Sequence, residues 1–338
     1  MTKELTVLEL AKELRERQES QQQWAEQYFA TLEDGHFTAI AINDDECVLA
    51  PYPDFAAAIY RGQNQYYEPC LSSLHRGFPS KIDILIERIR VAEFELLLSD
   101  HPAVVDYSNQ SLMGHRFRID YEALAQHYGL KTELLDFTSN PFVAAFFACC
   151  EYRADLQEYR PILRPRPPGI IYSLDAALDI AIRPEEPYSS VVGLQPLRRP
   201  AEQYAWCYRL RGHNSLNSQH FVSLHQFIHH PQASKKIFEK FEGGAKLFPY
   251  DPVSEKVQEI AAANRFSRAA FDLAMTRYGH NMRERSTLNE LARRGIQIVS
   301  DREVTFTHSE LVSIDDEWKE RRDDFMSRVH WRLAYGPL

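Results

Sequence analysis

Residues 121–148 limit what this chain can fold into more than any other stretch, because they change character three times. A mixture of apolar and polar residues indicates a helix that ends at Gly129, and the apolar pair Leu134-Leu135 then indicates a strand. Asn140-Pro141 indicates the start of a second helix, since asparagine is favoured at the N-cap and proline in the first turn. A chain with this order of elements is expected to mix helices and strands in one domain.

Polar residues gather at the edges of these predicted elements. They are His127, Tyr128, Asp136, Thr138 and Ser139. The predicted helix start at Asn140 adds free backbone N–H groups and the positive end of the helix dipole, which together favour an anion. The stretch therefore predicts a binding site as well as a scaffold.

Composition excludes several classes of function. The chain has 338 residues and a net charge of −9, which makes bulk binding of nucleic acid or of anionic membranes unfavourable. No apolar run is long enough for a membrane helix, and no GxGxxG or GxxxxGK[ST] motif is present. Five scattered cysteines and a group of histidines at 213–230 show no metal-ligand spacing, so we predict no metal site and a reducing, cytoplasmic location.

The remaining sequence divides into three predicted segments. Residues 1–50 are expected to form a helix (3–32) and a hairpin that turns at Asn43-Asp44-Asp45, and 51–255 form the core domain. Residues 256–338 are expected to form a mainly helical extension that could contact a partner. The other predicted helices are 80–98, 176–182, 235–242, 254–275, 284–294 and 310–333. The other predicted strands are at 59–60, 170–174, 203–210, 221–228 and 297–307, and 153–168 reads as a loop.

Three blocks of sequence resemble the FRG-domain family. They are Tyr60-Arg61-Gly62-Gln63; Ala125-Gln126-His127-Tyr128-Gly129 with Leu134-Leu135-Asp136-Phe137-Thr138-Ser139-Asn140-Pro141; and the pair Pro200-Ala201-Glu202-Gln203 and Leu247-Phe248-Pro249. Tyr60 stands where the family usually has Phe, and Phe137 where Trp is commoner, so both positions keep an aromatic ring. The third block departs further from the family's spacing. The resemblance covers about 55–255.

The order of these motifs also resembles, more weakly, that of ADP-ribosyltransferases. An aromatic-Arg-Gly strand end precedes a Thr-Ser pair before an apolar helix, and an acid or amide follows on a later strand. This resemblance implies an α+β fold with a small, mostly antiparallel split sheet and packed helices. It also implies NAD as the substrate that is cleaved. Fold-level analogy by itself says little about activity.

Arg61 is the leading candidate for charge in the site. Its guanidinium could hold the NAD diphosphate in a bidentate fork, with Gly62 allowing close approach, or it could form a buried ion pair with Asp136. Gln63 could contact nicotinamide or ribose, or it could face solvent.

The second block supplies the other candidate contacts to the cofactor. His127 could bind a ribose hydroxyl and Tyr128 could stack on nicotinamide, or both could be polar-tipped core residues that end a helix. Thr138, Ser139 and the Asn140 helix start could frame the ribose, or the two hydroxyls could bond locally within a turn.

Glu202 and Gln203 are the candidates for stabilising the ribosyl cation as nicotinamide leaves. A carboxylate suits a developing positive charge, which favours Glu202, whereas the family resemblance favours Gln203. Adjacent strand residues face opposite ways, so only one of them can point into the site. The sequence thus predicts an NAD-dependent ADP-ribosyltransferase-like enzyme that acts on an unknown protein or small-molecule acceptor. The alternative is a non-enzymatic nucleotide- or peptide-binding sensor whose helical tail contacts a partner.

Overall fold

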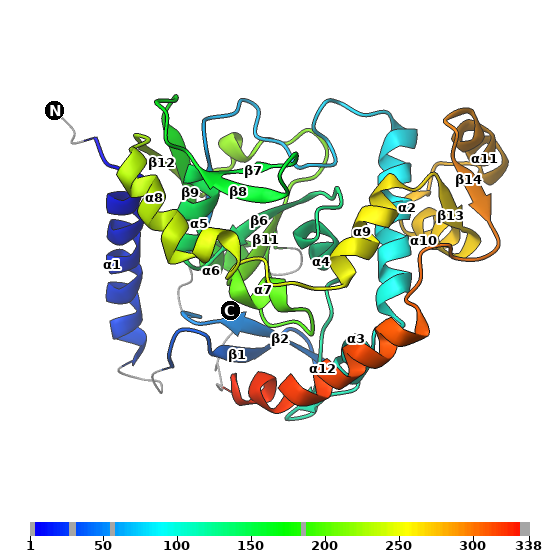
Figure 1. Ribbon diagram of the computed structural model, residues 1–338, viewed down its shortest axis with the longest axis horizontal. Coiled ribbons are helices and arrows are strands. Elements are labelled where there is room, and N and C mark those ends of the chain that lie inside the picture. The colour runs from blue at the N-terminus through cyan, green and yellow to red at the C-terminus, as the bar shows by residue number, and fades with distance from the viewer. Residues whose placement is uncertain (1–3, 27–31, 55–57, 184–186, 332–338) are drawn as a thin grey trace.

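The computed structural model describes residues 4–26, 32–54, 58–183 and 187–331, and it has the expected α+β fold with mostly antiparallel sheets (Figure 1). The larger sheet has the strand order β10-β11-β6-β3-β9-β12, and every neighbouring pair in it is antiparallel. Its strands are β3 (Ala58–Gln63), β6 (Leu134–Thr138), β9 (Gly169–Asp175), β10 (Ser189–Val191), β11 (Ala205–Arg209) and β12 (Val222–Phe227).

This sheet is split near its centre. Strand β3 pairs with β9 from Ala58 to Gln63, but it pairs with β6 only where Tyr60 faces Thr138. Beyond that pair the two halves of the sheet diverge, which leaves Arg61 on one side of the gap and Asp136 on the other. The expected split sheet is therefore present, and the candidate site lies at the gap between its two halves.

Helix α5 (Pro141–Cys149) covers the split. It begins as expected at the N-cap Asn140, and its residues are almost all buried. It packs against β3 at Gly62, where a Cβ atom would lie 1.8 Å from the carbonyl oxygen of Ala144. Helices α1 (Val7–Glu26) and α8 (Pro231–Lys240) pack against α5 from outside and complete this core.

The second sheet, in the order β15-β1-β2-β5-β4, joins all three predicted segments of the chain. The predicted hairpin is confirmed, because Asn43 Oδ1 accepts the N–H groups of Asp45 and Glu46 at the turn. The strands are β1 (Phe37–Ala41), β2 (Glu46–Pro51), β4 (Ser111–Leu112), β5 (His115–Phe117) and β15 (Val329–Trp331). The C-terminal strand pairs with β1, so the end of the described chain is part of this sheet.

Helix α2 (Lys81–Leu98) carries the C-terminal elements. A capping box of Ser80 and Asp83 starts it, and one of its faces packs on α10 (Arg268–Tyr278) and α11 (Glu284–Arg293). The remaining helices are α3 (Pro102–Ser108), α4 (Tyr121–His127), α6 (Ala176–Ile182), α7 (Arg198–Glu202), α9 (Val253–Ala262), α12 (His308–Ser327), and the 3₁₀ turns η1 (Leu216–Ser218) and η2 (Glu242–Gly244). No helix in the described ranges is long and apolar enough to cross a bilayer.

Five predicted elements differ from the structure. The helix predicted at 310–333 ends at Ser327 and is followed by strand β15, and the strand predicted at 297–307 ends at Val299. The helix predicted at 254–275 is interrupted, because Arg265–Ser267 form strand β13 and pair with β14 (Gln297–Val299). The segment predicted as a loop at 153–168 begins in a hairpin of β7 (Cys150–Arg153) and β8 (Glu158–Pro161), and its other three prolines follow the hairpin. The strand predicted from Gln203 starts only at Ala205, because the preceding residues form helix α7.

Candidate functional site

A cavity of about 190 Å³ lies at the split, between β3, β6 and α5. Its polar lining comes from Arg61, Asp136, Thr138 and Gln203, and Tyr60, Phe137 and the underside of α5 supply apolar surface. Of the predicted site residues, Arg61, Gly62, Thr138 and Gln203 line this one cavity. His127 does not line it and contacts Gln203 instead.

Arg61 bridges the split without forming the predicted ion pair. Its Nη1 donates to the backbone carbonyl of Asp136 at 2.8 Å, and within the described residues no carboxylate pairs with it. Its Nε is buried and finds no hydrogen-bond partner among those residues. The alternative of an Arg61–Asp136 ion pair is therefore wrong: the main-chain carbonyl of Asp136 accepts one guanidinium N–H, and no carboxylate of the described residues neutralises the positive charge.

Among the described residues that line the cavity, Asp136 is the only one with a carboxylate. Its Oδ2 accepts from Gln126 Nε2 at 3.2 Å, whereas its Oδ1 is buried and accepts no hydrogen bond from the described part of the chain. The sequence places Asp136 among the polar residues at the element edges, but the one role predicted for it is as an ion-pair partner of Arg61. The signal that could have identified it is its position in the strand, since Asp136 is the polar residue between Leu135 and Phe137, which both belong to the buried core.

A hydrogen-bond chain fixes the amide of Gln203. Gln203 Nε2 donates to the carbonyl of Leu247 at 2.9 Å, which turns Oε1 toward His127 Nδ1 at 3.2 Å. Because that oxygen can only accept, Nδ1 carries the proton. His127 Nε2 then lies 3.9 Å from Asp136 Oδ1 and has no hydrogen-bond partner in the described ranges. His127 therefore orients Gln203 and leaves an unsatisfied nitrogen facing Asp136.

The choice between Glu202 and Gln203 is decided by helix α7. Gln203 is its C-cap and lines the cavity, whereas Glu202 points away and lies 3.7 Å from Arg328 with 44% of its side chain exposed. The amide favoured by the resemblance thus occupies the site, and the carboxylate favoured by chemistry does not. Asp136 is the carboxylate that the cavity offers in its place.

The turn before α5 uses its polar groups locally. Thr138 Oγ1 donates to the carbonyl of Gln203 at 2.7 Å and accepts from the N–H of Asn140. Asn140 Oδ1 caps the N–H of Phe142 at 3.0 Å, so this side chain occupies part of the predicted anion site. Ser139 is fully buried, and its Oγ has no partner among the described residues. Of these three residues, only Thr138 lines the cavity.

Two further candidates also lie away from the cavity. Gln63 Nε2 contacts Cys70 Sγ at 3.4 Å, and the Tyr128 hydroxyl donates to the carboxylate of Asp251. Burial, reinforced by that carboxylate, raises the pKa of Tyr128 well above its ordinary value. Gly62 does border the cavity, but the close approach that it permits is made by helix α5.

The family model of the FRG domain matches residues 56–157. This segment is an FRG domain. It includes β3, β6 and α5, and so it contains both lips of the split. Gln203 and Leu247 lie beyond the match, so the extension of the FRG resemblance to about 255 stays a prediction. No curated protein and no solved structure gives a significant match to the chain.

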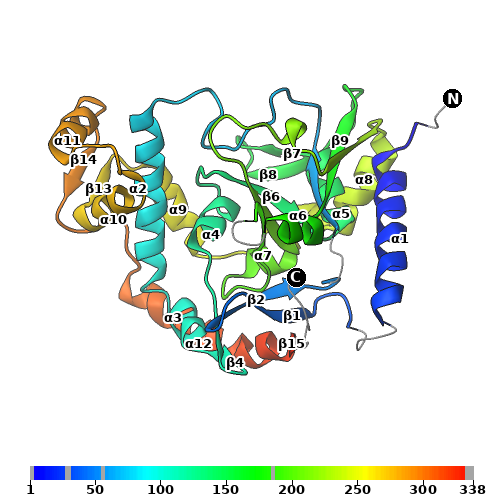
Figure 2. The ribbon, with the colours of Figure 1, turned by 180° about the vertical axis from the view of Figure 1, so that it is seen from behind.

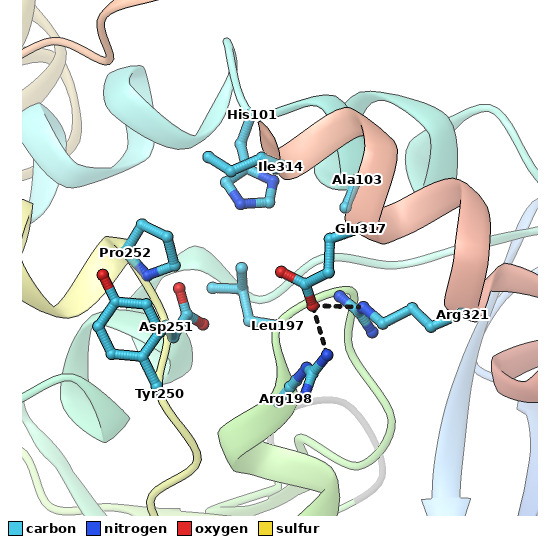
Figure 3. A pocket seen from close by; sticks show the side chains of 10 residues that line it. All are labelled: His101, Ala103, Leu197, Arg198, Tyr250, Asp251, Pro252, Ile314, Glu317 and Arg321. Atoms are coloured by element: carbon cyan, nitrogen blue, oxygen red, sulfur yellow. Dashed lines mark hydrogen bonds and ion pairs between the residues drawn. The ribbon is translucent and has the colours of Figure 1, made fainter. Parts of the chain in front are cut away.

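A second, smaller cavity lies between α3, the start of α7, the segment before α9 and the C-terminal helix α12 (Figure 3). It measures about 20 Å³, which is room for one water molecule. Glu317 of α12 pairs with Arg198 at 2.5 Å and with Arg321 at 3.4 Å, and the His101 ring lies across from these groups. His101 Nδ1 is buried without a hydrogen-bond partner from the described residues.

His101 makes the stability of this junction depend on pH. Burial, helped by the nearby Arg321 and opposed by Glu317, lowers the pKa of His101 to about 4 from its ordinary 6.5. As the pH falls from 6.5, His101 therefore binds a proton in the unfolded chain before it does so in the folded chain. Stability is full above that value, and about 3 kcal/mol is expected to be lost by pH 4.

Urea denaturation of the wild type and of His101→Asn tests this expectation. The carboxylates titrate in both proteins, so the difference between their losses of unfolding free energy reports the contribution of His101. The loss of stability between pH 7 and pH 4 should be smaller in the variant. Equal losses in the two proteins would contradict the assignment.

Proposed function

We propose that the cavity at the split binds NAD and that the protein is an ADP-ribosyltransferase-like enzyme. The observation that carries this proposal is that Arg61, which has no ion-pair partner among the described residues, and the acidic residue Asp136 line one cavity at the split. A guanidinium suits a diphosphate because its planar fork matches two phosphate oxygens. The motif order and the split sheet support the same reading.

The proposed reaction breaks the bond between the ribose C1′ and the nicotinamide nitrogen. Nicotinamide leaves with the bonding electron pair, positive charge develops on the ribose, and a nucleophile of the acceptor attacks C1′ and loses a proton. Asp136 stabilises the developing cation, since its negatively charged side chain lines the cavity and is 36% exposed. Gln203, with its amide fixed by His127 and Leu247, orients the leaving group or the acceptor.

The size of the cavity determines how NAD would be held. A volume of about 190 Å³ is smaller than the roughly 300–1,000 Å³ of pockets that enclose whole ligands. We therefore assign the enclosed space to nicotinamide and its ribose. The rest of the dinucleotide lies outside, with its diphosphate beside Arg61.

Arg61→Ala is expected to weaken NAD binding by about 10–100-fold, which corresponds to the loss of charge-assisted hydrogen bonds worth about 1.5–3 kcal/mol. Arg61→Lys should recover part of the affinity, because it keeps the charge and loses the fork. Isothermal titration calorimetry measures both. Arg153→Ala serves as a control, since Arg153 pairs with Asp155 on an exposed hairpin and should not matter. Absence of NAD binding by the wild type would contradict the proposal.

A second candidate function is a sensor that binds a nucleotide without cleaving it. The orientation of Glu202 favours it, since the carboxylate predicted for catalysis faces Arg328 and an amide lines the cavity instead. Nicotinamide release distinguishes the two functions. Saturable NAD binding with no release above the uncatalysed rate, in the presence of a lysate as a source of acceptors, would support the sensor and contradict the enzyme.

A further inference from the structure

The elements β13, α10, α11 and β14 form a basic unit in an acidic chain. Residues 263–299 contain seven arginines, no lysine and only three carboxylates, for a formal charge of +4, whereas the whole chain carries −9. The unit lies at the end of the molecule opposite to α1 (Figures 1 and 2). Its position separates it from the cavity in the split sheet.

Helix α11 presents one polar face to solvent. Thr287 and Leu291 are buried, and the helix packs on α2 and β14 through that side. On the opposite side Arg285, Asn289 and Arg293 follow one another at intervals of four residues, so they share one exposed face. Arg283, the N-cap residue, is exposed just before them.

The arginines of the unit fall into two groups. Four of them form ion pairs that hold the unit together and attach it to the rest of the fold. These pairs are Arg265 with Glu303, Arg268 with Asp272 and Glu284, Arg277 with Glu95, and Arg294 with Asp83. Arg283 and Arg285 form no ion pair within the described residues. Arg293 pairs only with Glu290 of its own helix, among those residues, and 77% of its side chain is exposed. Within this unit, the arginines that form no ion pair with another element are thus concentrated on and beside one helix face.

We propose that α11 binds duplex DNA with this face in the major groove. An α-helix with side chains is about 10–12 Å across and fits a groove about 12 Å wide. Arginine and asparagine are side chains that hydrogen-bond base edges there, and arginine also neutralises phosphates. Duplex RNA is a poorer partner because its major groove is deep and narrow. The negative charge of the remaining chain confines the contact to this unit.

The test is fluorescence anisotropy with a labelled mixed-sequence DNA duplex at low salt, using the full chain. The variant Arg283→Ser, Arg285→Ser, Arg293→Ser is expected to bind at least about 10-fold more weakly. Its plot of log affinity against log salt should be less steep by about one unit for each phosphate that the variant no longer neutralises. The control Arg153→Ser, Arg160→Ser, Arg166→Ser makes the same charge change on the exposed loop-hairpin region and should bind like the wild type.

Unchanged thermal unfolding of both variants, followed by circular dichroism, ensures that binding and not folding is compared. The proposal is overturned if the wild type shows no saturable binding, or if both triple variants lose affinity equally. It is also overturned if duplex RNA or heparin competes more strongly than unlabelled duplex DNA. The inference does not rest on the proposed function, because Arg61→Ala leaves α11 unchanged and should bind DNA normally.

Discussion

Replacing Gly62 by alanine is expected to destabilise the protein by more than about 3 kcal/mol, at the upper end of what overpacking a core costs. The new Cβ would lie 1.8 Å from the Ala144 carbonyl oxygen and 2.9 Å from the Ala148 nitrogen. Both are main-chain atoms of α5, so no side-chain rotation can relieve the contact. Helix α5 and strand β3 must separate, and the cavity between them changes shape.

A matched glycine separates this steric effect from backbone strain. Gly77 has a φ of +81°, and a Cβ there would meet no atom of the described residues within 4 Å. Gly77→Ala should therefore cost only about 1 kcal/mol, the usual penalty of a left-handed alanine. Urea denaturation measures both variants. If they lose the same stability, the close packing of α5 on β3 is not what requires glycine at position 62.

Local signals account for the parts of the fold that the sequence predicts well. Asn140-Pro141 starts α5, Gly129 ends the helix before β6, and the Asn43 turn joins β1 to β2. In each case the residues that determine the conformation are the residues that adopt it. The helix predicted at 254–275 failed for the opposite reason, because Arg265–Ser267 become a strand only by pairing with Gln297–Val299.

Only part of the cavity lining was predictable from the sequence, and the geometry of the side chains was not. Arg61, Thr138 and Gln203 do line one cavity, whereas the neighbours His127 and Tyr128 diverge, one toward Gln203 and the other toward Asp251. The direction of a side chain at a helix end depends on partners far away in sequence. Such partners leave no local pattern.

Arg61 combines a structural and a proposed functional role, which affects how its variants are read. The hydrogen bond to the Asp136 carbonyl spans the place where β3 and β6 stop pairing, so it compensates for a missing sheet contact. Loss of ligand binding in Arg61→Ala is therefore interpretable only if the variant unfolds like the wild type. Asp136 gives a cleaner test, since its side chain takes no part in that bridge.

Asp136→Asn is expected to lower the rate of nicotinamide release by about 100–1,000-fold, as for the removal of one preorganised electrostatic interaction with a transition state. Asparagine is nearly the same size, and its oxygen can still accept from Gln126, so the fold should persist. NAD affinity should change much less than the rate, because the positive charge of the nicotinamide ring moves onto the ribose only as the bond to nicotinamide breaks. Single-turnover release of nicotinamide and calorimetric titration of NAD measure the two effects.

The control for this variant is Glu202→Gln, which removes the carboxylate first favoured on chemical grounds. Its pairing with Arg328 is long and exposed, and such pairs contribute little to stability. The rate of nicotinamide release by Glu202→Gln should match that of the wild type. If Asp136→Asn released nicotinamide as fast as the wild type and Glu202→Gln released it slowly, Glu202 would be the catalytic carboxylate. Helix α7 would then have to rotate when NAD binds. Loss of NAD affinity in Asp136→Asn, with release unchanged at saturation, would make Asp136 a ground-state contact and favour the sensor over the enzyme.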